Sequence, residues 1–448
     1  MPTLISTISG WGRYPLQSCE LERPERYAEL RPTADKLIAR GQGRSYGDAA
    51  LNENGRVLLT ERVNRLLEFD VEQGTLRAEA VATLAEILDV IVPAGWFLPV
   101  TPGTKFVSLG GCVAADVHGK NHHHDGSFGE HVLSIELILA DGSHITCSPA
   151  ENPQLFWATV GGMGLTGIIG EVCIKLIPIS SAYMQVRHHS ASDLEHLFGL
   201  MQDARTDDRY SVAWIDSMAS GGRLGRGVVM CGHHAAQNEL PAVMPASGKA
   251  ERKRAIPFDF PAFALNSLSI SAFNSLYYQR EGGKREAFLN RYDPYFYPLD
   301  AIENWNRLYG KQGFVQYQCV LPDAVAYDGM RKLLQELADS RRPSFLAVLK
   351  RLGAEGRGLL SFPVAGYTLA LDLPIRDAGL FALLNKLDGI VMQHGGRVYL
   401  AKDARLSAES FRAMYPRYAE WLKVKNAVDP HNRFSSSLSR RLAIGEGV

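Results

Sequence analysis

An excess of charge of one sign and long hydrophobic runs are both missing from the sequence. It has 48 Lys and Arg against 48 Asp and Glu, a formal net charge of +0, so we expect no nucleic-acid partner. No window reaches the roughly 18 apolar residues of a membrane-spanning helix. The N-terminus, MPTLISTISGWGRYPLQSCE, has no basic leader followed by an apolar stretch. These absences predict a cytoplasmic protein.

Cysteine is scarce, and several familiar motifs are absent. The six cysteines form no CxxC pair, which argues against zinc ribbons and thioredoxin-type redox sites, so we expect reduced and mostly buried thiols. No GxxxxGK[ST] occurs, which excludes a P-loop. No GxGxxG precedes a predicted helix, so a nicotinamide-binding Rossmann site is unsupported.

The residues that are present suit a soluble globular enzyme of two domains, since the chain has 448 residues, 46% hydrophobic and 21% charged. From Lys36 to Pro178, short strands alternate with helices. We predict strands at Lys36–Arg40, Arg56–Thr60 and Gly167–Pro178, hairpins at Leu66–Ala80 (turning at Gln73-Gly74) and His131–Cys147 (with Asp141-Gly142 as a two-residue turn), and helices at Leu84–Val92 and Pro153–Val160, the second capped by Asn152.

The middle of the chain, from Ser181 to Gly396, predicts an antiparallel sheet with helices on one face, so the fold class is α+β. The segment Pro241–Asn274 is rich in Pro, Ser and Ala without a period, which predicts a mobile lid or loop. From Arg397 onward we expect a strand, a helix and a polar tail. The predicted strands of the middle part are Tyr210–Asp216, Gly313–Leu321, Ser344–Leu349 and Tyr367–Leu373, and its helices lie near Asp323–Ser340 and Gly379–His394.

Four glycine-containing segments carry the chemistry: Ala39–Asp48, Thr101–Gly111, Cys112–Gly129 and Thr159–Ile169. Any one of them is also explained by a tight turn. Four in one domain indicate a long cofactor lying across many backbone amides, because a single phosphate needs only one such loop. Flavin adenine dinucleotide (FAD) fits this pattern, since its pyrophosphate needs N–H donors and its ring system needs a flat, close-packed floor.

The stretch VHGKNHHHDGSFGEH holds five of the chain's thirteen histidines. His118 and His122 are four residues apart, a spacing that suits a metal. A metal site requires ligands fixed on rigid elements, however, and this run has the pattern of a glycine-rich loop. We predict no metal, and we expect most of these histidines to bond backbone or water.

The segments ARGQGRSYGD, TPGT, SLGGCVAADVHGKNHH, GSFGEHV and LFWATVGGMGLTGIIG together resemble the FAD-binding domain of the vanillyl-alcohol-oxidase-type flavoproteins. The likeness continues through YSVAWID, WNRLYG, GFVQYQCVLP, SFLAVLKRLG, YLAKDAR and AMYPR, and within this family it is closest to the decaprenylphosphoryl-β-D-ribose 2′-oxidases. The resemblance implies a two-subdomain FAD-binding domain in residues 1–180, an antiparallel-sheet substrate or cap domain in residues 181–396, and a C-terminal segment, 397–448, that returns to the FAD-binding domain.

The resemblance also implies roles for individual positions. Lys402 would lie beside the isoalloxazine ring and the substrate. The cofactor would be bound by Ala39, Arg40, Gly41, Gln42, Gly43, Arg44, Ser45, Tyr46, Gly47, Asp48, Ala49, Gly103, Ser108, Leu109, Gly110, Gly111, Ala115, Asp116, Val117, His118, Ile169 and Tyr399. The substrate pocket would be lined by Lys120, Trp214, Gln316, Gln318 and Lys350.

Covalent members of the family attach flavin through a histidine in a GxGHS-like turn. In this chain the turn is Gly41-Gln42-Gly43-Arg44-Ser45, with Arg44 at the histidine position. We therefore predict non-covalent FAD.

Oxidation of a secondary alcohol by FAD transfers a hydride to flavin N5 and releases the hydroxyl proton. A cation near N1 stabilises the negative charge that develops, and we assign Lys402 either to this role or to orienting the hydroxyl. The proton acceptor stays open between His118, Lys402 with a lowered pKa, and water.

Substrate recognition follows from strand alternation, which puts Gln316 and Gln318 on one face, suited to sugar hydroxyls. The alternative is an ordinary solvent face of a sheet. Lys350 could bind a phosphate, and its alternative is a surface lysine. The chain departs from the resemblance at Phe296, Thr368 and Ala370, where the closest pattern has tyrosine, asparagine and cysteine.

Two enzymatic functions follow from these assignments. The first is oxidation of the 2′-hydroxyl of a polyprenylphosphoryl-ribose-like substrate, the first half of an epimerisation to the arabinose form. An NAD-dependent short-chain reductase would complete it, and a lipid-linked substrate would bring peripheral membrane contact. The alternative is an FAD-dependent oxidase or dehydrogenase of a small soluble polyol or sugar lactone. A third interpretation is a non-catalytic flavoprotein. The sequence leaves the electron acceptor and the oligomeric state open.

Overall fold

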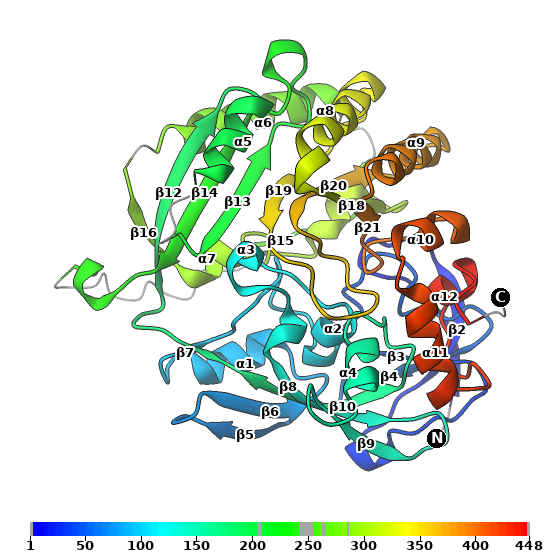
Figure 1. The fold of residues 1–448 in the computed structure, drawn as a ribbon. Coiled ribbons are helices and arrows are strands. Elements are labelled where there is room, and N and C mark those ends of the chain that lie inside the picture. Colours follow the sequence, from blue (N-terminus) through cyan, green and yellow to red (C-terminus); the bar gives the residue numbers. More distant parts are fainter. Residues whose placement is uncertain (1–2, 204–207, 242–253, 262–265, 285, 446–448) are drawn as a thin grey trace.

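Three sheets organise the chain in a computed structural model that describes residues 3–445 apart from 204–207, 242–253, 262–265 and 285 (Figure 1). The N-terminal sheet has the order β1-β2-β4-β3, with β2 and β3 both parallel to β4. Two of its strands confirm the prediction, and the other two were not predicted. The strands are β1 (Thr3–Ile8), β2 (Gln17–Glu22), β3 (Leu37–Arg40) and β4 (Arg56–Leu59).

The second sheet has five strands in the order β5-β6-β10-β8-β9, all paired antiparallel. The hairpin predicted at 66–80 is confirmed, because Gly74 takes φ +61° at its turn. Thr83 and Glu86 close a capping box on the helix α1, as expected for a helix start. The elements are β5 (Leu66–Asp70), β6 (Thr75–Glu79), β8 (Val132–Ile138), β9 (His144–Cys147), β10 (Ile168–Lys175), α1 (Leu84–Ile91), α2 (Leu109–Ala114) and α4 (Pro153–Thr159).

Two local predictions in this region are wrong. The β8–β9 hairpin does not use a two-residue turn: the Gly142 N–H donates to Leu139 O, the Leu139 N–H donates to Ser143 O, and only Gly142 has a positive φ, of 88°. Asn152 precedes α4 but does not cap it, because its backbone is left-handed and its side-chain amide donates to Thr146 O at 2.9 Å.

The third sheet is antiparallel throughout, which confirms the predicted α+β class. Helices α5, α8 and α9 cover one of its faces, and the first two sheets lie toward the other (Figure 1). In sheet order the strands are β16 (Phe288–Arg291), β12 (Tyr183–Ala191), β14 (Gly227–His234), β13 (Tyr210–Ile215), β19 (Ala347–Leu352), β20 (Gly366–Pro374), β18 (Phe314–Pro322) and β21 (Arg397–Val398), and the covering helices are α5 (Leu194–Gln202), α8 (Asp323–Ser340) and α9 (Gly379–Gln393).

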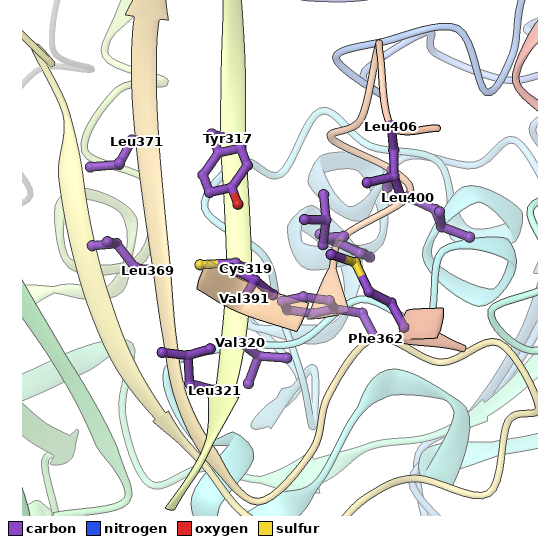
Figure 2. Packing of buried hydrophobic residues seen from close by; sticks show 14 of the residues in the cluster. Tyr317, Cys319, Val320, Leu321, Phe362, Leu369, Leu371, Val391, Leu400 and Leu406 are labelled. Atoms are coloured by element: carbon purple, nitrogen blue, oxygen red, sulfur yellow. The ribbon is translucent and has the colours of Figure 1, made fainter. Parts of the chain in front are cut away.

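The largest core cluster lies between this sheet and its helices and continues into the segment that follows β21 (Figure 2). Tyr317 and Cys319 of β18, Leu369 and Leu371 of β20, and Val391 of α9 belong to it. Strand alternation explains the pattern, since odd-numbered residues of β18 point to the helices and even-numbered ones to the opposite face.

Three predictions for the second half of the chain need correction. The predicted loop Pro241–Asn274 contains residues 242–253 and 262–265, which lie outside the described residues, but from residue 267 it is the helix α6 (Ser267–Gly282). Strand β19 begins at Ala347 rather than at Ser344. The C-terminal part has three helices instead of one: α10 (Ala408–Met414), α11 (Tyr418–Val428) and α12 (Ser437–Arg441).

Shorter elements complete the described chain. Phe434, which follows α11, bridges to Leu37 of the N-terminal sheet, so the end of the chain packs there. The remaining elements include α3 (His122–Asp125), α7 (Tyr292–Phe296), β7 (Trp96–Phe97), β11 (Ile177–Pro178), β15 (Arg254–Ala255) and β17 (Ile302–Glu303).

A strap of residues 353–365, between β19 and β20, fastens the large sheet to the glycine segments. The carboxylate of Asp116, which is fully buried, accepts hydrogen bonds from Ser361 Oγ in the strap at 2.5 Å and from Ser127 Oγ at 2.7 Å. It also accepts from the Gly129 N–H at 2.8 Å. Burial raises the pKa of Asp116, and these three donors lower it. This carboxylate therefore joins the two halves of the molecule.

Replacing Asp116 with alanine should lower stability by about 3 kcal/mol, because three buried donors lose a charged acceptor. Thermal melting monitored by circular dichroism measures the effect. The matched control is Glu130→Gln, which weakens an exposed ion pair with Arg357 in the same strap and should cost about 1 kcal/mol or less. Equal melting temperatures for Asp116→Ala and the control would contradict the role of Asp116.

Candidate active site

The four glycine segments interlock around α2. The Gly161 N–H donates to Val113 O at 3.0 Å and the Met163 N–H donates to Ala114 O at 2.8 Å, which joins the fourth segment to the third. A Cβ on Gly41 would lie 2.4 Å from Ser108 Oγ, so the first segment packs directly on the second. Glycine at 41 therefore leaves room for the Ser108 side chain, which lies directly against it.

These segments line an open cradle that fits FAD. Gly103 is exposed, and a Cβ built on it would meet no atom within 4 Å, while Gly111 would meet only Ser108. Residues 40–46 are half-buried, whereas residues 37–38 before them and 47–49 after them are buried. Exposed backbone at a rim of glycines offers N–H donors to an anion and a floor free of side chains, as a dinucleotide requires.

Two of the predicted cofactor residues use their side chains for the protein instead. The carboxylate of Asp48 pairs with Arg441 at 2.7 Å, and that of Asp116 holds the strap. The side chains of both residues therefore organise the cradle rather than face it. That the backbone groups of Asp48 and Asp116 contact the cofactor stays a prediction.

An aromatic cluster stands where the strap meets the cradle. Phe362 stacks on Tyr399 with ring centroids 4.7 Å apart, and His118 lies 5.3 Å from Tyr399 and 5.4 Å from Phe362. The Tyr399 hydroxyl donates to Ala115 O at 2.8 Å. Packing of this kind fixes both His118 and Tyr399, two predicted cofactor residues, against the end of α2.

The face of the large sheet opposite α8 and α9 forms a wall of aligned residues. Directly paired residues on antiparallel strands share a face. One row across four strands is Trp214, Val348, Ala370 and Gln318, a second contains Lys350 and Thr368, and a third contains Asp372 and Gln316. The structure therefore brings Trp214, Gln316, Gln318 and Lys350 together on one wall. Their binding of substrate stays a prediction.

Gln316 and Gln318 are 6% and 4% exposed, which rules out an ordinary solvent face. Gln318 Nε2 lies 2.8 Å from His118 Nε2 and donates to Thr368 Oγ1 at 3.1 Å. Gln316 Nε2 donates to Asp372 Oδ1 at 2.5 Å. The wall is thus bonded to the glycine segments through His118.

Three half-buried lysines meet at this wall: Lys120, Lys350 and Lys402. Loss of hydration lowers the pKa of Lys350 to about 8. The pKa of Lys402 is lowered to about 7, first by loss of hydration and secondarily by the positive charge of Lys350. Loss of hydration, and secondarily Lys350, lowers the pKa of Lys120 to about 7. The Lys120 ammonium donates to Tyr295 O and lies 4.1 Å from the centre of that ring. None of the three is an ordinary surface lysine.

Lys402 lies with its ammonium 3.9 Å from the ring centre of Tyr46, a cation–π contact with the first glycine segment. Asp372 counteracts the lowering of the Lys402 pKa. Gln316 bonds both the Tyr46 side chain and Asp372. Lys402 is therefore connected to the cofactor segment and to the wall at once.

Sequence reasoning missed Asp372 and Tyr309. Asp372 is fully buried, its pKa is raised to about 6 by burial, and the Tyr309 hydroxyl donates to its Oδ2 at 3.3 Å. A signal was available, because Asp372 is the one carboxylate in the otherwise apolar strand YTLALDL. Tyr309, in the predicted motif WNRLYG, carried no comparable signal.

His118 is a weak base in this setting. Burial first, and then Lys350, His122 and Lys402, hold its pKa well below the usual value, so the imidazole stays neutral. Its Nδ1 is buried without a hydrogen-bond partner among the described residues. A buried nitrogen without a hydrogen-bond partner fits a site that a ligand completes. The role of His118 as proton acceptor stays a prediction.

Two other histidines of the run, His122 and His131, have structural partners. His122 Nδ1 accepts from the Gly353 N–H of the strap at 3.0 Å, and His131 Nε2 lies 2.8 Å from Asp125 O. Residues 122–125 form the one-turn helix α3 rather than a loop. Within the described ranges, no three His, Cys, Asp or Glu side chains are placed to hold a metal ion.

Arg44, at the position where covalent relatives would have histidine, is held between aromatic rings. Its guanidinium lies 4.2 Å from the ring centre of Trp11 and 5.6 Å from that of Phe106. A guanidinium cannot be the attachment point of a flavin, and its stacking keeps it at the rim of the cradle.

Comparison with known proteins agrees with this geometry. A family model described as "FAD binding domain" matches residues 26–148, and one described as "D-arabinono-1,4-lactone oxidase" matches residues 377–442. Decaprenylphosphoryl-beta-D-ribose oxidase of Mycolicibacterium smegmatis is 36% identical over 456 residues, which cover 99% of this chain and 98% of that protein. The chain belongs to the decaprenylphosphoryl-β-D-ribose oxidase family.

More distant relatives share the cofactor domain or the fold. Human Delta(24)-sterol reductase is 31% identical over 130 residues, 29% of this chain and 25% of that protein. The structure of Physcomitrella patens BBE-like 1 matches with a TM-score of 0.67 at 12% identity, over 93% of this chain and 90% of that one. The predicted vanillyl-alcohol-oxidase-type fold is confirmed.

Membership of this oxidase family makes the chain an FAD-dependent oxidoreductase, so the non-catalytic interpretation is not retained. The predicted cofactor, FAD, is confirmed, and when bound it supplies a two-electron acceptor for a hydride. None of the described helices combines the length and apolar character needed to cross a bilayer.

Because Arg44 replaces the attachment histidine, denaturation with acid should release all of the FAD. We expect the yellow colour in the supernatant and a colourless protein pellet, measured by absorbance after centrifugation. Flavin fluorescence that stays with the polypeptide on a denaturing gel would show a covalent bond and contradict this prediction.

Proposed function

We propose that the chain oxidises a secondary sugar hydroxyl, the 2′-hydroxyl of a polyprenylphosphoryl-ribose-like substrate, as the first half of an epimerisation to the arabinose form. The observation that carries this proposal is the wall of the large sheet, where amide groups and ammonium groups face the FAD cradle. The printed name of the Mycolicibacterium relative supports the choice of substrate.

Each part of the wall suits one part of such a substrate. Gln316 and Gln318 offer amide groups to ribose hydroxyls from one strand face. Lys350 and Lys120 offer positive charge to a phosphate, and their low pKa values mean that an anion nearby would favour their charged forms. Ala370, between Gln318 and Val348, leaves room where a larger side chain would fill the wall.

Lys402 is the residue that we assign to the reaction itself. Its ammonium stabilises negative charge that develops next to the cradle, in a site where few water molecules compete. Asp372 favours the charged form of Lys402, and Gln316 holds Asp372 in place. The proton of the substrate hydroxyl passes to water or to a group of this cluster.

The product of this step is a ketone, which a separate reductase must convert to the epimeric alcohol. We propose an NAD-dependent short-chain reductase as this partner, because the chain has no nicotinamide-binding motif of its own. A polyprenyl-linked substrate would bring the protein to a membrane surface without a spanning helix.

A second candidate is oxidation of a small soluble polyol or sugar lactone. The match of residues 377–442 to the model described as "D-arabinono-1,4-lactone oxidase" favours it, since this range contains Lys402. The two candidates differ in the phosphate, which only the lipid-linked substrate presents to Lys350.

Anaerobic mixing separates the candidates. Phosphoribosyl polyprenyl lipid should bleach the flavin absorbance near 450 nm, because its phosphate and hydroxyls match the wall, while free ribose, polyols and lactones should bleach it at least about 100-fold more slowly. Stopped-flow absorbance measures both rates. Bleaching by lactone or polyol alone would reject the first candidate and support the second.

The reduction rate at low substrate concentration should fall as the pH rises through about 7, where Lys402 loses its proton. Burial lowers this pKa, so the ammonium is present below it and absent above it. Lys402→Ala should keep bound FAD yet lose about 100-fold or more in rate, together with the pH dependence. A rate that rises through this pH range, or an unchanged Lys402→Ala variant, would contradict the assignment.

A further inference from the structure

Arg441, in the short C-terminal helix α12, contacts two segments of the active site, the end of the first glycine segment and the turn after Lys402. Its Nε and Nη2 donate to the two carboxylate oxygens of Asp48 at 3.0 and 2.7 Å. Its Nη2 also pairs with Asp403 Oδ2 at 2.8 Å, and its Nη1 donates to Leu406 O at 2.6 Å. The Asp48 and Asp403 side chains are only 4% and 1% exposed.

These two carboxylates belong to the segments that form the site. Asp48 ends the first glycine segment, and Asp403 directly follows Lys402. The Oδ1 atom of Asp403 accepts the Arg405 and Leu406 N–H groups at 2.9 Å, so this carboxylate shapes the turn after the lysine. Arg441 therefore holds the same turn through the other carboxylate oxygen of Asp403, Oδ2.

The same two segments touch directly. The Tyr46 N–H donates to Ala401 O at 3.1 Å, and a Cβ on Gly47 would lie 1.7 Å from Asp403 O. The turn after Lys402 is also anchored in the large core cluster through Leu400 and Leu406 (Figure 2). A shift of either segment would move the other, and with it the contact between Lys402 and Tyr46.

Charge balance depends on Arg441 as well. One guanidinium faces two buried carboxylates, and both of them raise its pKa against the effect of burial. Without it, the carboxylates of Asp48 and Asp403 would be two buried negative charges without a cation, and Asp403 directly follows Lys402 in the chain. The other groups that face Lys402 are Tyr46 from the first glycine segment, Asp372 from β20, Lys350 from β19 and His118 from the third glycine segment.

We propose that Arg441 is a positioning residue that couples FAD binding to Lys402: it fixes the first glycine segment through Asp48 and the lysine turn through Asp403. The C-terminal helix is then part of the active-site framework rather than a surface appendage. The proposal rests on the proposed function of Lys402.

The test uses the full-length, FAD-loaded protein and three variants. Arg441→Gln removes the charge, Arg441→Lys keeps the charge without the planar fork, and Arg441→Gln with Asp403→Asn removes the opposing charges together. The matched control is Arg440→Gln, because Arg440 is its neighbour in α12 but bonds Asn52 and Glu53 O, away from the lysine turn. FAD affinity is measured by fluorescence titration, and the pH midpoint of anaerobic flavin reduction by whichever substrate bleaches the wild type best.

We expect Arg441→Gln to weaken FAD binding at least tenfold and to move the pH midpoint upward by at least half a unit, because the unbalanced Asp403 favours the ammonium form of Lys402. The double variant should return the midpoint to that of the wild type and keep the weak FAD binding. Arg441→Lys keeps the positive charge and serves as the test if Arg441→Gln does not fold. It should weaken FAD binding with little change of the pH midpoint. Arg440→Gln should match the wild type in both.

Equal FAD affinities, or equal pH midpoints, for Arg441→Gln and Arg440→Gln would overturn the proposal, because a merely structural role lowers stability without moving a midpoint. The variant Lys402→Ala distinguishes this failure from that of the proposed function. If Lys402→Ala keeps the wild-type pH profile, the assignment of Lys402 fails and the coupling fails with it. If it abolishes the profile while Arg441→Gln leaves it in place, only the proposal for Arg441 fails.

Discussion

The active site depends on an excess of positive charge that is held partly out of water at the wall. Lys120, Lys350 and Lys402 converge on one wall, where Asp372 is the carboxylate that acts on Lys402. Positive charge taken out of water without a partner raises the free energy of the folded protein, which appears here as three lowered pKa values. The imbalance is relieved when a ligand brings negative charge. Reduction of FAD and, under the proposed function, binding of a substrate phosphate would both do so.

The architecture keeps these lysines in place by joining segments that are distant in sequence. The strap of residues 353–365 binds Asp116 and packs Phe362 on Tyr399, so the large sheet and the FAD cradle meet in a bonded, aromatic contact. The turn after Lys402 is held from the other side by the first glycine segment and by α12. An ammonium can remain at an unfavourable location only when the framework around it cannot relax.

Sequence reasoning recovered the features that local chemistry controls. Strand alternation placed Gln316 and Gln318 on one face, the periodicity of residues 323–340 gave α8, and the glycine at position 74 gave the first hairpin. It failed where a tertiary contact or a competing hydrogen bond decides. The Asn152 amide donates to Thr146 O instead of capping α4. Helix α6 has no apolar stripe that would predict it, and single contacts hold it, such as Trp214 on Tyr277 and Asn274 on Asp216. Asp372, Asp403 and Arg441 acquire their roles only when strands and termini far apart in the chain come together.

The charge of Lys402 can be measured directly through the two-electron reduction potential of the bound FAD, by anaerobic spectroelectrochemistry near pH 6. Because a nearby ammonium favours the reduced, negatively charged cofactor, we predict a potential about 30 to 60 mV lower in Lys402→Met than in the wild type. Identical potentials in the two proteins would show that the ammonium does not act on the cofactor, and would contradict the central role given to buried charge.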